Sequence, residues 1–244
     1  MSRFWRKIVT IYAFVVFLLS AVVLAIPLSL VFRLLWGDKE KRRFQFHRIF
    51  SNYLRWLAFH IPGVKTSVLN PHGETFDQPA VIICNHQSHL DLLLTMMLSP
   101  RIVAMTNQWV WNFPLYAPIL RYLEFYPAAD GIETNLDHMR SLVERGYSLL
   151  IFPEGTRSAD CEILRFHRGA FYLAEQLNLD IVPLFLVGPG KVLPKTDFTL
   201  MPGELKLIVG ERVAASDQNY GENYREKTRN WHQYYIQRWK DLNA

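Results

Sequence analysis

The chain has 244 residues, half of them hydrophobic, with a formal net charge of +5 and two cysteines. This length suits one domain with a substantial core plus short appendages. Two cysteines cannot form a disulfide framework, and the basic residues form neither a long tract nor a nucleic-acid-binding motif. The composition argues against a disulfide scaffold and a nucleic-acid-binding protein, and favours a cytosol-facing domain whose basic surface attracts anionic lipids.

An apolar stretch lies near the N-terminus. No charged residue occurs from Ile8 to Phe32, and roughly 25 helical positions are enough to cross a bilayer. Basic residues flank the stretch on both sides, so the positive-inside rule gives no orientation. Pro27 predicts a kink or break. Two interpretations fit: a transmembrane helix, or a bent helix that enters one leaflet. The length of the stretch argues against a cleaved signal peptide.

A second helix is predicted from about Lys41 to His60, and the sequence IPG that follows ends it. Apolar residues recur along it at helical spacing: Phe46, Ile49, Phe50, Tyr53, Leu54 and Leu57. Lys41, Arg48 and Arg55 lie roughly on the opposite face. The pattern fits an interfacial helix on a membrane and a helix packed on its own domain equally well.

The central region alternates apolar runs with helical patterns. Strands are predicted at 65–69, 80–84, 101–105, 148–152, 181–187 and 205–209, and helices at 90–98, 115–123, 136–145 and 170–177. This alternation predicts an α/β fold with a mixed, largely parallel sheet flanked by helices. Functional sites in such sheets lie beyond the carboxyl ends of strands, here after Cys84 and Phe152.

The chain is therefore divided into three parts. Residues 1–62 are predicted to be N-terminal membrane-anchoring helices, 63–215 the α/β domain, and 216–244 a C-terminal amphipathic helix. The last helix either packs on the domain or rests on the membrane.

The sequence NHQSHLD follows the first strand end. A turn that brings Asp91 back to His86 would fix the imidazole tautomer, so that the other ring nitrogen can take a proton from a hydroxyl. Asp91 can instead simply cap the next helix. His86, His89 and Asp91 are also three possible metal ligands, but no further cluster completes a metal site. Cys84 lies inside the predicted strand, where a buried thiol is more common than a nucleophile.

The sequence PEGTRS follows the second strand end. Gly155 permits a tight turn whose N–H groups can cradle an anion, and Arg157 can grip a phosphate with two hydrogen bonds. Glu154 either orients Arg157 or hydrogen-bonds a substrate hydroxyl. Arg165 and Arg168 precede a helix N-terminus, which favours anions. An ordinary loop and a solvated basic turn are the alternatives, but two basic loops at one sheet edge together favour an anionic substrate.

The order and spacing of NHQSHLD, FPEGTRS and VPLFLVG resemble the glycerolipid acyltransferase family, which includes the lysophosphatidic acid acyltransferases. The resemblance extends from the amphipathic helix to about Val213. It implies that His86 is the general base and that Asp91 orients it. The second motif and the basic loop together give the predicted acceptor-binding residues: Glu154, Gly155, Thr156, Arg157, Arg165 and Arg168.

The resemblance implies transfer of an acyl chain from acyl-CoA or acyl-carrier protein to a lysolipid hydroxyl, without a metal or other cofactor. The leading acceptor is 1-acylglycerol-3-phosphate, which would give phosphatidic acid. The expected partners are a membrane lipid and the donor, with no nucleic acid, and the expected location is the cytoplasmic face of a bacterial inner membrane.

One departure from the family pattern affects the acceptor. The family usually carries an arginine between the two motifs, in a phrase like F-I-D-R, but no arginine or lysine occurs between Arg121 and Arg140. A phosphate-free lysolipid, such as an acylated amino acid, is therefore the alternative acceptor. A metal-dependent hydrolase and a non-catalytic membrane-binding module are the remaining hypotheses.

Overall fold

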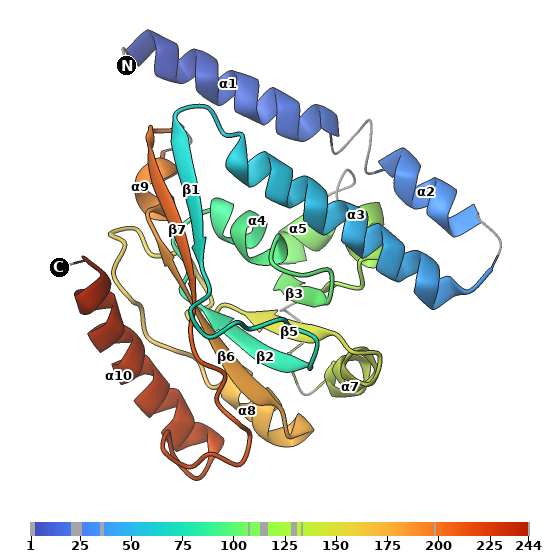
Figure 1. Cartoon of the computed structure of the whole chain (residues 1–244), viewed down its shortest axis with the longest axis vertical. Helices are drawn as coiled ribbons and strands as arrows, with labels where there is room; N and C mark the ends of the chain where they lie inside the picture. Colours follow the sequence, from blue (N-terminus) through green and yellow to red (C-terminus); the bar gives the residue numbers. More distant parts are fainter. Residues whose placement is uncertain are drawn as a thin grey trace.

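A seven-stranded sheet, in the order β1-β7-β6-β2-β5-β3-β4, forms the centre of the protein (Figure 1). The structure is a computed structural model that describes residues 3–20, 26–34, 37–106, 108–112, 117–127, 131–132, 134–197 and 199–243. The strands are β1 (Val64–Leu69), β2 (Ala80–Cys84), β3 (Ile102–Thr106), β4 (Tyr126–Pro127), β5 (Ser148–Ile151), β6 (Asp180–Val187) and β7 (Gly203–Val209). The helices are α1 (Arg3–Ser20), α2 (Ile26–Leu34), α3 (Lys39–Phe59), α4 (Leu90–Met96), α5 (Gln108–Asn112), α6 (Ala117–Tyr122), α7 (Leu136–Glu144), α8 (Gly169–Leu177), α9 (Pro189–Val192) and α10 (Tyr224–Asn243).

The sheet is mixed and largely parallel, which confirms the predicted fold class. Neighbouring strands run parallel from β4 through β3, β5 and β2 to β6, as do β1 and β7, whereas β6 and β7 are antiparallel. Every residue of β2 is buried, as expected for a strand with both faces of its sheet covered. The carboxyl ends of β2, β5 and β6 meet at one edge, so the segments after Cys84, Ile151 and Val187 come together there.

Helices cover both faces of the sheet (Figure 1). Helix α10 packs over α8 on one side, and its buried aromatic residues are Trp231, Tyr235 and Trp239. The C-terminal helix thus packs on the sheet domain. Helices α3 and α4 lie on the other side, where the Ser51 hydroxyl donates to the Met96 carbonyl at 2.9 Å.

Helix α3 forms as predicted, and it packs on its own domain, which is one of the two interpretations left open by its sequence. It buries Phe46 and Leu54 against the core. Its outer face keeps Ile49, Trp56 and Phe59 exposed. The helix therefore packs on its own domain while still presenting apolar side chains outward.

The described part of the N-terminal apolar stretch lies in helices α1 and α2, and Pro27 lies in the first turn of α2. Across the described ranges, no helix combines the length and apolar character needed to cross a membrane. Helix α1 is held to the domain by the Thr10 hydroxyl, which accepts the Leu200 N–H at 2.9 Å. Its exposed apolar side chains are Ile8, Ile11, Tyr12, Phe14 and Val15.

The short elements β4, α5 and α9 were not predicted, because each contains five residues or fewer and has no clear periodicity. The expected end of α7 is confirmed. Gly146 follows Arg145 with φ +86° and donates its N–H to the Val143 carbonyl at 2.9 Å. A left-handed residue at this point is a usual helix stop.

Candidate active site

The segment after β2 turns back on itself and joins His86 to Asp91. We call residues 85–91 the histidine turn. His86 Nδ1 lies 2.8 Å from Asp91 Oδ2, and the same oxygen accepts the backbone N–H groups of Gln87 at 2.5 Å and Ser88 at 2.7 Å. Asp91 is fully buried. Because Asp91 Oδ2 is an acceptor, His86 donates from Nδ1, and Nε2 carries the lone pair that a general base needs.

Asp91 is not the cap of α4. The N-cap position belongs to His89, whose side chain makes no capping bond, and Asp91 lies in the first turn. The carboxylate instead accepts N–H groups from the turn that precedes the helix. Its geometry therefore supports the predicted orienting function more than the capping alternative.

The His86 ring is held from two directions. It stacks on Phe152, with ring centroids 4.2 Å apart and an angle of 21° between the planes. The Asp91 bond fixes rotation within that plane. The side chain keeps 19% of its surface exposed, and Nε2 has no hydrogen-bond partner in the part of the chain that the structure describes. A substrate hydroxyl can thus reach the basic nitrogen.

Asn85 fixes the point where β2 ends. Its side-chain amide donates to the Leu186 carbonyl at 2.9 Å and accepts the Leu186 N–H at 2.8 Å. The side chain is fully buried. Beyond the last paired residue of β2, it makes the hydrogen bonds to β6 that a strand backbone would otherwise make. The sequence interpretation missed Asn85, whose position directly after a buried strand was the available signal.

The PEGTRS segment binds the histidine turn through backbone groups. Glu154 Oε1 accepts the His86 N–H at 2.9 Å, and Oε2 accepts the Leu164 N–H at 3.1 Å. The Ser158 N–H donates to the His86 carbonyl at 2.7 Å. Among the described residues Glu154 makes no hydrogen bond to Arg157, so these contacts do not support the predicted orientation of Arg157 by Glu154.

Gly155 adopts the tight turn that its sequence predicts. Its φ is +66°, and its N–H donates to the Phe152 carbonyl at 3.0 Å. A Cβ atom there would approach His167 Cδ2 to 3.1 Å. Gly155 and Thr156 are both exposed at this turn, so their backbone groups can face a ligand.

The predicted cations lie on the segments around this turn. Arg157 is partly buried, and within the described residues its Nη1 is buried without a hydrogen-bond partner. Arg165 and Arg168 are exposed. Arg168 is the N-cap of α8 and, with His167 and Tyr172, lines a pocket of about 250 Å³.

Lys195 is a further cation that the sequence interpretation missed. Its Nζ donates to the Arg157 carbonyl at 2.7 Å. It lies on the segment that follows β6, whose carboxyl end is at the same sheet edge as β2. The strand-end rule, applied to Val187 as well as to Cys84 and Phe152, would have identified this segment.

The stretch that lacks an arginine contains an ion-pair cluster instead. Glu124 accepts Arg43 Nη1 at 2.6 Å, and Arg145 Nη1 and Nη2 at 2.7 and 3.0 Å. These bonds connect α3 to the segment after α6 and to the end of α7. Asp130, an acidic residue in the same stretch of sequence, lies outside the described residues.

Burial shifts the pKa of two other candidates, Cys84 and His89. Cys84 is fully buried, and burial raises the pKa of its thiol well above the usual value. Burial, assisted by Arg157 and His86, lowers the pKa of His89. In the ranges described, no group of three His, Cys, Asp or Glu side chains could hold a metal ion.

Known proteins resemble this chain in sequence. The acyltransferase family profile matches residues 65–187. A 1-acyl-sn-glycerol-3-phosphate acyltransferase of Chlamydomonas reinhardtii is 28% identical over 214 residues, covering 84% of this chain and 60% of the relative. The human 1-acyl-sn-glycerol-3-phosphate acyltransferase alpha is 32% identical over 142 residues, covering 54% and 50%. The chain thus spans about half to three fifths of these relatives.

The fold matches a solved structure over nearly its full length. The crystal structure of the 1-acyl-sn-glycerophosphate acyltransferase of Thermotoga maritima superposes with a TM-score of 0.80, covering 98% of both chains at 19% sequence identity. At this identity the likeness establishes the arrangement of helices and strands.

Proposed function

Because the chain belongs to the acyltransferase family, we propose that it transfers an acyl chain from a thioester donor to the hydroxyl of a lysolipid. The acceptor is 1-acylglycerol-3-phosphate and the product phosphatidic acid. The observation that carries the proposal is the 2.8 Å contact of His86 Nδ1 with the buried Asp91, which leaves Nε2 as the base.

The reaction needs only one proton acceptor. The acceptor hydroxyl gives its proton to His86 Nε2 while its oxygen attacks the thioester carbonyl carbon. The resulting imidazolium is stabilised by Asp91. Collapse of the tetrahedral intermediate breaks the C–S bond, and the thiolate takes the proton back from His86. No acyl-enzyme forms, in keeping with the burial of the Cys84 thiol.

The cations around the Gly155 turn support a phosphate-bearing acceptor. Arg157 is partly exposed beside this turn, and Lys195 adds a charge beside its backbone. Guanidinium groups bind phosphate oxygens with strong, charge-assisted hydrogen bonds. A phosphate-free lysolipid is the second candidate, favoured by the lack of a cationic residue between Arg121 and Arg140.

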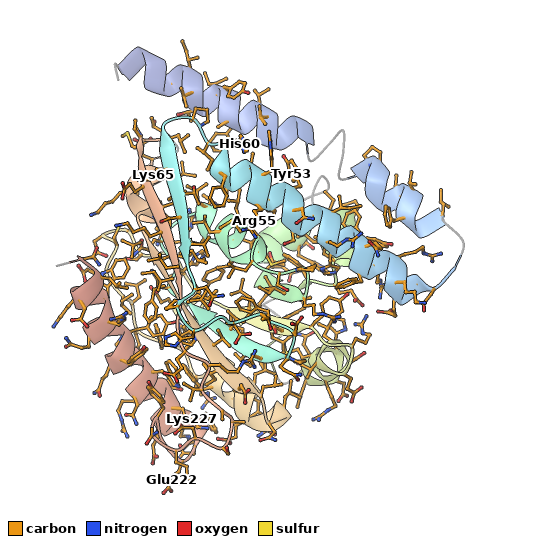
Figure 2. All side chains as sticks on the ribbon, in the orientation of Figure 1. Tyr53, Arg55, His60, Lys65, Glu222 and Lys227 are labelled. Atoms are coloured by element: carbon orange, nitrogen blue, oxygen red, sulfur yellow. The ribbon has the colours of Figure 1, made fainter. Side chains whose placement is uncertain are left out.

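The proposed location is a membrane surface, specifically the cytoplasmic face of a bacterial inner membrane. Support comes from the exposed apolar residues of α1 and from the outer face of α3. On α3 the ring of Trp56 stacks on Tyr53 and His60, with centroids 6.4 and 4.8 Å apart; Tyr53 and His60 are labelled in Figure 2. Aromatic rings of this kind favour membrane–water interfaces. The proposed donor is acyl-CoA or acyl-carrier protein, and no other cofactor is needed.

An acyl-transfer assay on the full chain tests the function. Labelled acyl-CoA and acyl-carrier protein are offered with lysophosphatidic acid and with phosphate-free lysolipids, using wild type, His86→Ala and the exposed-histidine control His72→Ala. We expect lysophosphatidic acid to be acylated by wild type and His72→Ala and not by His86→Ala. Transfer to phosphate-free acceptors alone would overturn the acceptor, and activity in His86→Ala would overturn the mechanism.

A further inference from the structure

We propose that Glu154 is a positioning residue, which holds the backbone of His86 in place and does not bind the acceptor. The proposal rests on the transfer reaction proposed above and assigns the glutamate of PEGTRS a different function from the one implied by the resemblance.

Both oxygens of the Glu154 carboxyl group accept backbone N–H groups, and burial raises the pKa of this group to about 8. Oε1 accepts the His86 N–H at 2.9 Å, and Oε2 accepts the Leu164 N–H at 3.1 Å. Only 3% of the residue is exposed. A side chain so enclosed has no free face for a lipid hydroxyl or phosphate, so its effect on the reaction passes through the groups that it holds.

The backbone of His86 is bonded on both sides by the same segment. While Glu154 accepts its N–H, Ser158 donates its own N–H to the His86 carbonyl at 2.7 Å. The segment closes on itself further along, where the His167 N–H donates to the Pro153 carbonyl at 2.7 Å. The PEGTRS segment thus hydrogen-bonds the peptide groups on both sides of His86. Glu154 makes its bond through the side chain, whereas Ser158 uses its backbone N–H.

This arrangement sets the position of His86 Nε2. The Asp91 bond and the Phe152 ring hold the imidazole itself, whereas the bonds to its peptide groups hold the Cα from which the side chain extends. The position of that Cα depends on its peptide groups. A shift of about 1 Å in a reacting atom can cost on the order of 100-fold in rate, so loosening this support slows the chemical step without removing any contact to substrate.

Glu154→Gln is the most specific variant with which to test the positioning function. The amide keeps the size of the side chain and one accepting oxygen, but its NH₂ group cannot accept the second backbone N–H. We expect kcat to fall about 10- to 100-fold with the KM for the acceptor unchanged. Glu162→Gln, an exposed glutamate on the same segment, is the matched control and should behave as wild type.

A second readout needs no turnover. In protein labelled with ¹⁵N-histidine, NMR follows the exchange rate of the His86 backbone amide, assigned with His86→Ala. We expect exchange to accelerate at least tenfold in Glu154→Gln and to stay unchanged in Glu162→Gln. If Glu154→Gln does not fold, Glu154→Asp replaces it. This variant keeps both oxygens on a shorter stem, and it should lower kcat by less while leaving KM unchanged.

The outcomes separate this proposal from the proposed function. A raised acceptor KM with unchanged kcat and unchanged His86 exchange would overturn the positioning function and make Glu154 a substrate ligand. Wild type inactive with every acceptor, together with faster His86 exchange in Glu154→Gln, would overturn the proposed reaction and leave the structural hold on His86 supported.

Discussion

The hydroxyl of Tyr235 lies 2.9 Å from the carbonyl oxygen of Ile83, one residue before the end of β2, and 3.1 Å from the Leu184 carbonyl. Helix α10 therefore hydrogen-bonds the backbone of the neighbouring strands β2 and β6, close to the histidine turn. Tyr235 is fully buried, and burial raises the pKa of its hydroxyl well above the usual value. The hydroxyl is thus a neutral donor at any working pH.

Tyr235→Phe should destabilise the protein by about 1–3 kcal/mol, because buried carbonyl oxygens lose their donor while the aromatic ring remains. Chemical denaturation, followed by tryptophan fluorescence, measures the change. Tyr234→Phe, whose neighbouring hydroxyl is only partly buried, is the control. Equal stability of the two variants would contradict the structural importance of the Tyr235 bond.

Asp91→Asn should lower kcat by about 10²- to 10⁴-fold. The amide cannot stabilise an imidazolium as a carboxylate does, and its NH₂ group would face the donors that now surround Oδ2. Steady-state kinetics with circular dichroism as a check on folding give the answer. Asp137→Asn changes an exposed aspartate in the first turn of another helix and should leave kcat at the wild-type value. A fully active Asp91→Asn would exclude Asp91 from the mechanism.

Lys195→Met should raise the KM for lysophosphatidic acid about tenfold, equivalent to ~1.4 kcal/mol of binding. Methionine preserves an unbranched side chain but removes the charge next to Arg157. A phosphate-free lysolipid should show no such change. Lys206→Met, on the exposed side of β7, is the control. Equal losses with both acceptors would show that Lys195 supports the loop and not the phosphate.

His47 should make the free energy of unfolding depend on pH, independently of the active site. Burial, with Arg43 and Arg145 nearby, lowers its pKa from 6.5 to about 3. Between these values the unfolded chain binds a proton that the folded protein does not, so the free energy of unfolding falls as the pH falls below 6.5. The slope from this group is at most about 1.4 kcal/mol per pH unit.

His47→Gln removes this term and should flatten the dependence between pH 5 and 7. Urea unfolding of both proteins across that range measures the difference, with the exposed His72→Gln as the control. Parallel curves for wild type and His47→Gln would show that His47 is protonated in the folded protein.

The sequence predicted the parts that local patterns determine. The apolar run of β2 and the helical spacing of α3 gave their bounds to within two residues, and the rule for strand ends brought His86 and the PEGTRS segment to one edge. The contacts of Glu154 could not be predicted, because its partner His86 is 68 positions away and the bond is to a backbone group. No residue pattern records such a bond.

The sequence also could not predict what each amphipathic helix face contacts. The aromatic residues of α10 would suit a membrane or a protein core, and only the position of the Ile83 and Leu184 carbonyls shows why Tyr235 turns inward. Helix α3 has apolar residues on more than one face, so its pattern alone could not separate the buried Phe46 from the exposed Trp56.

The ion pairs of Glu124 with Arg43 and Arg145 have a geometric consequence for the proposed reaction. They join α3 to the segment after α6 and to the end of α7, and so help to set the separation between the outer face of α3 and the Nε2 atom of His86. If Trp56 rests among lipid headgroups, that separation becomes a height above the bilayer. The enzyme would then select an acceptor hydroxyl by its height above the membrane plane as well as by the chemical groups next to it.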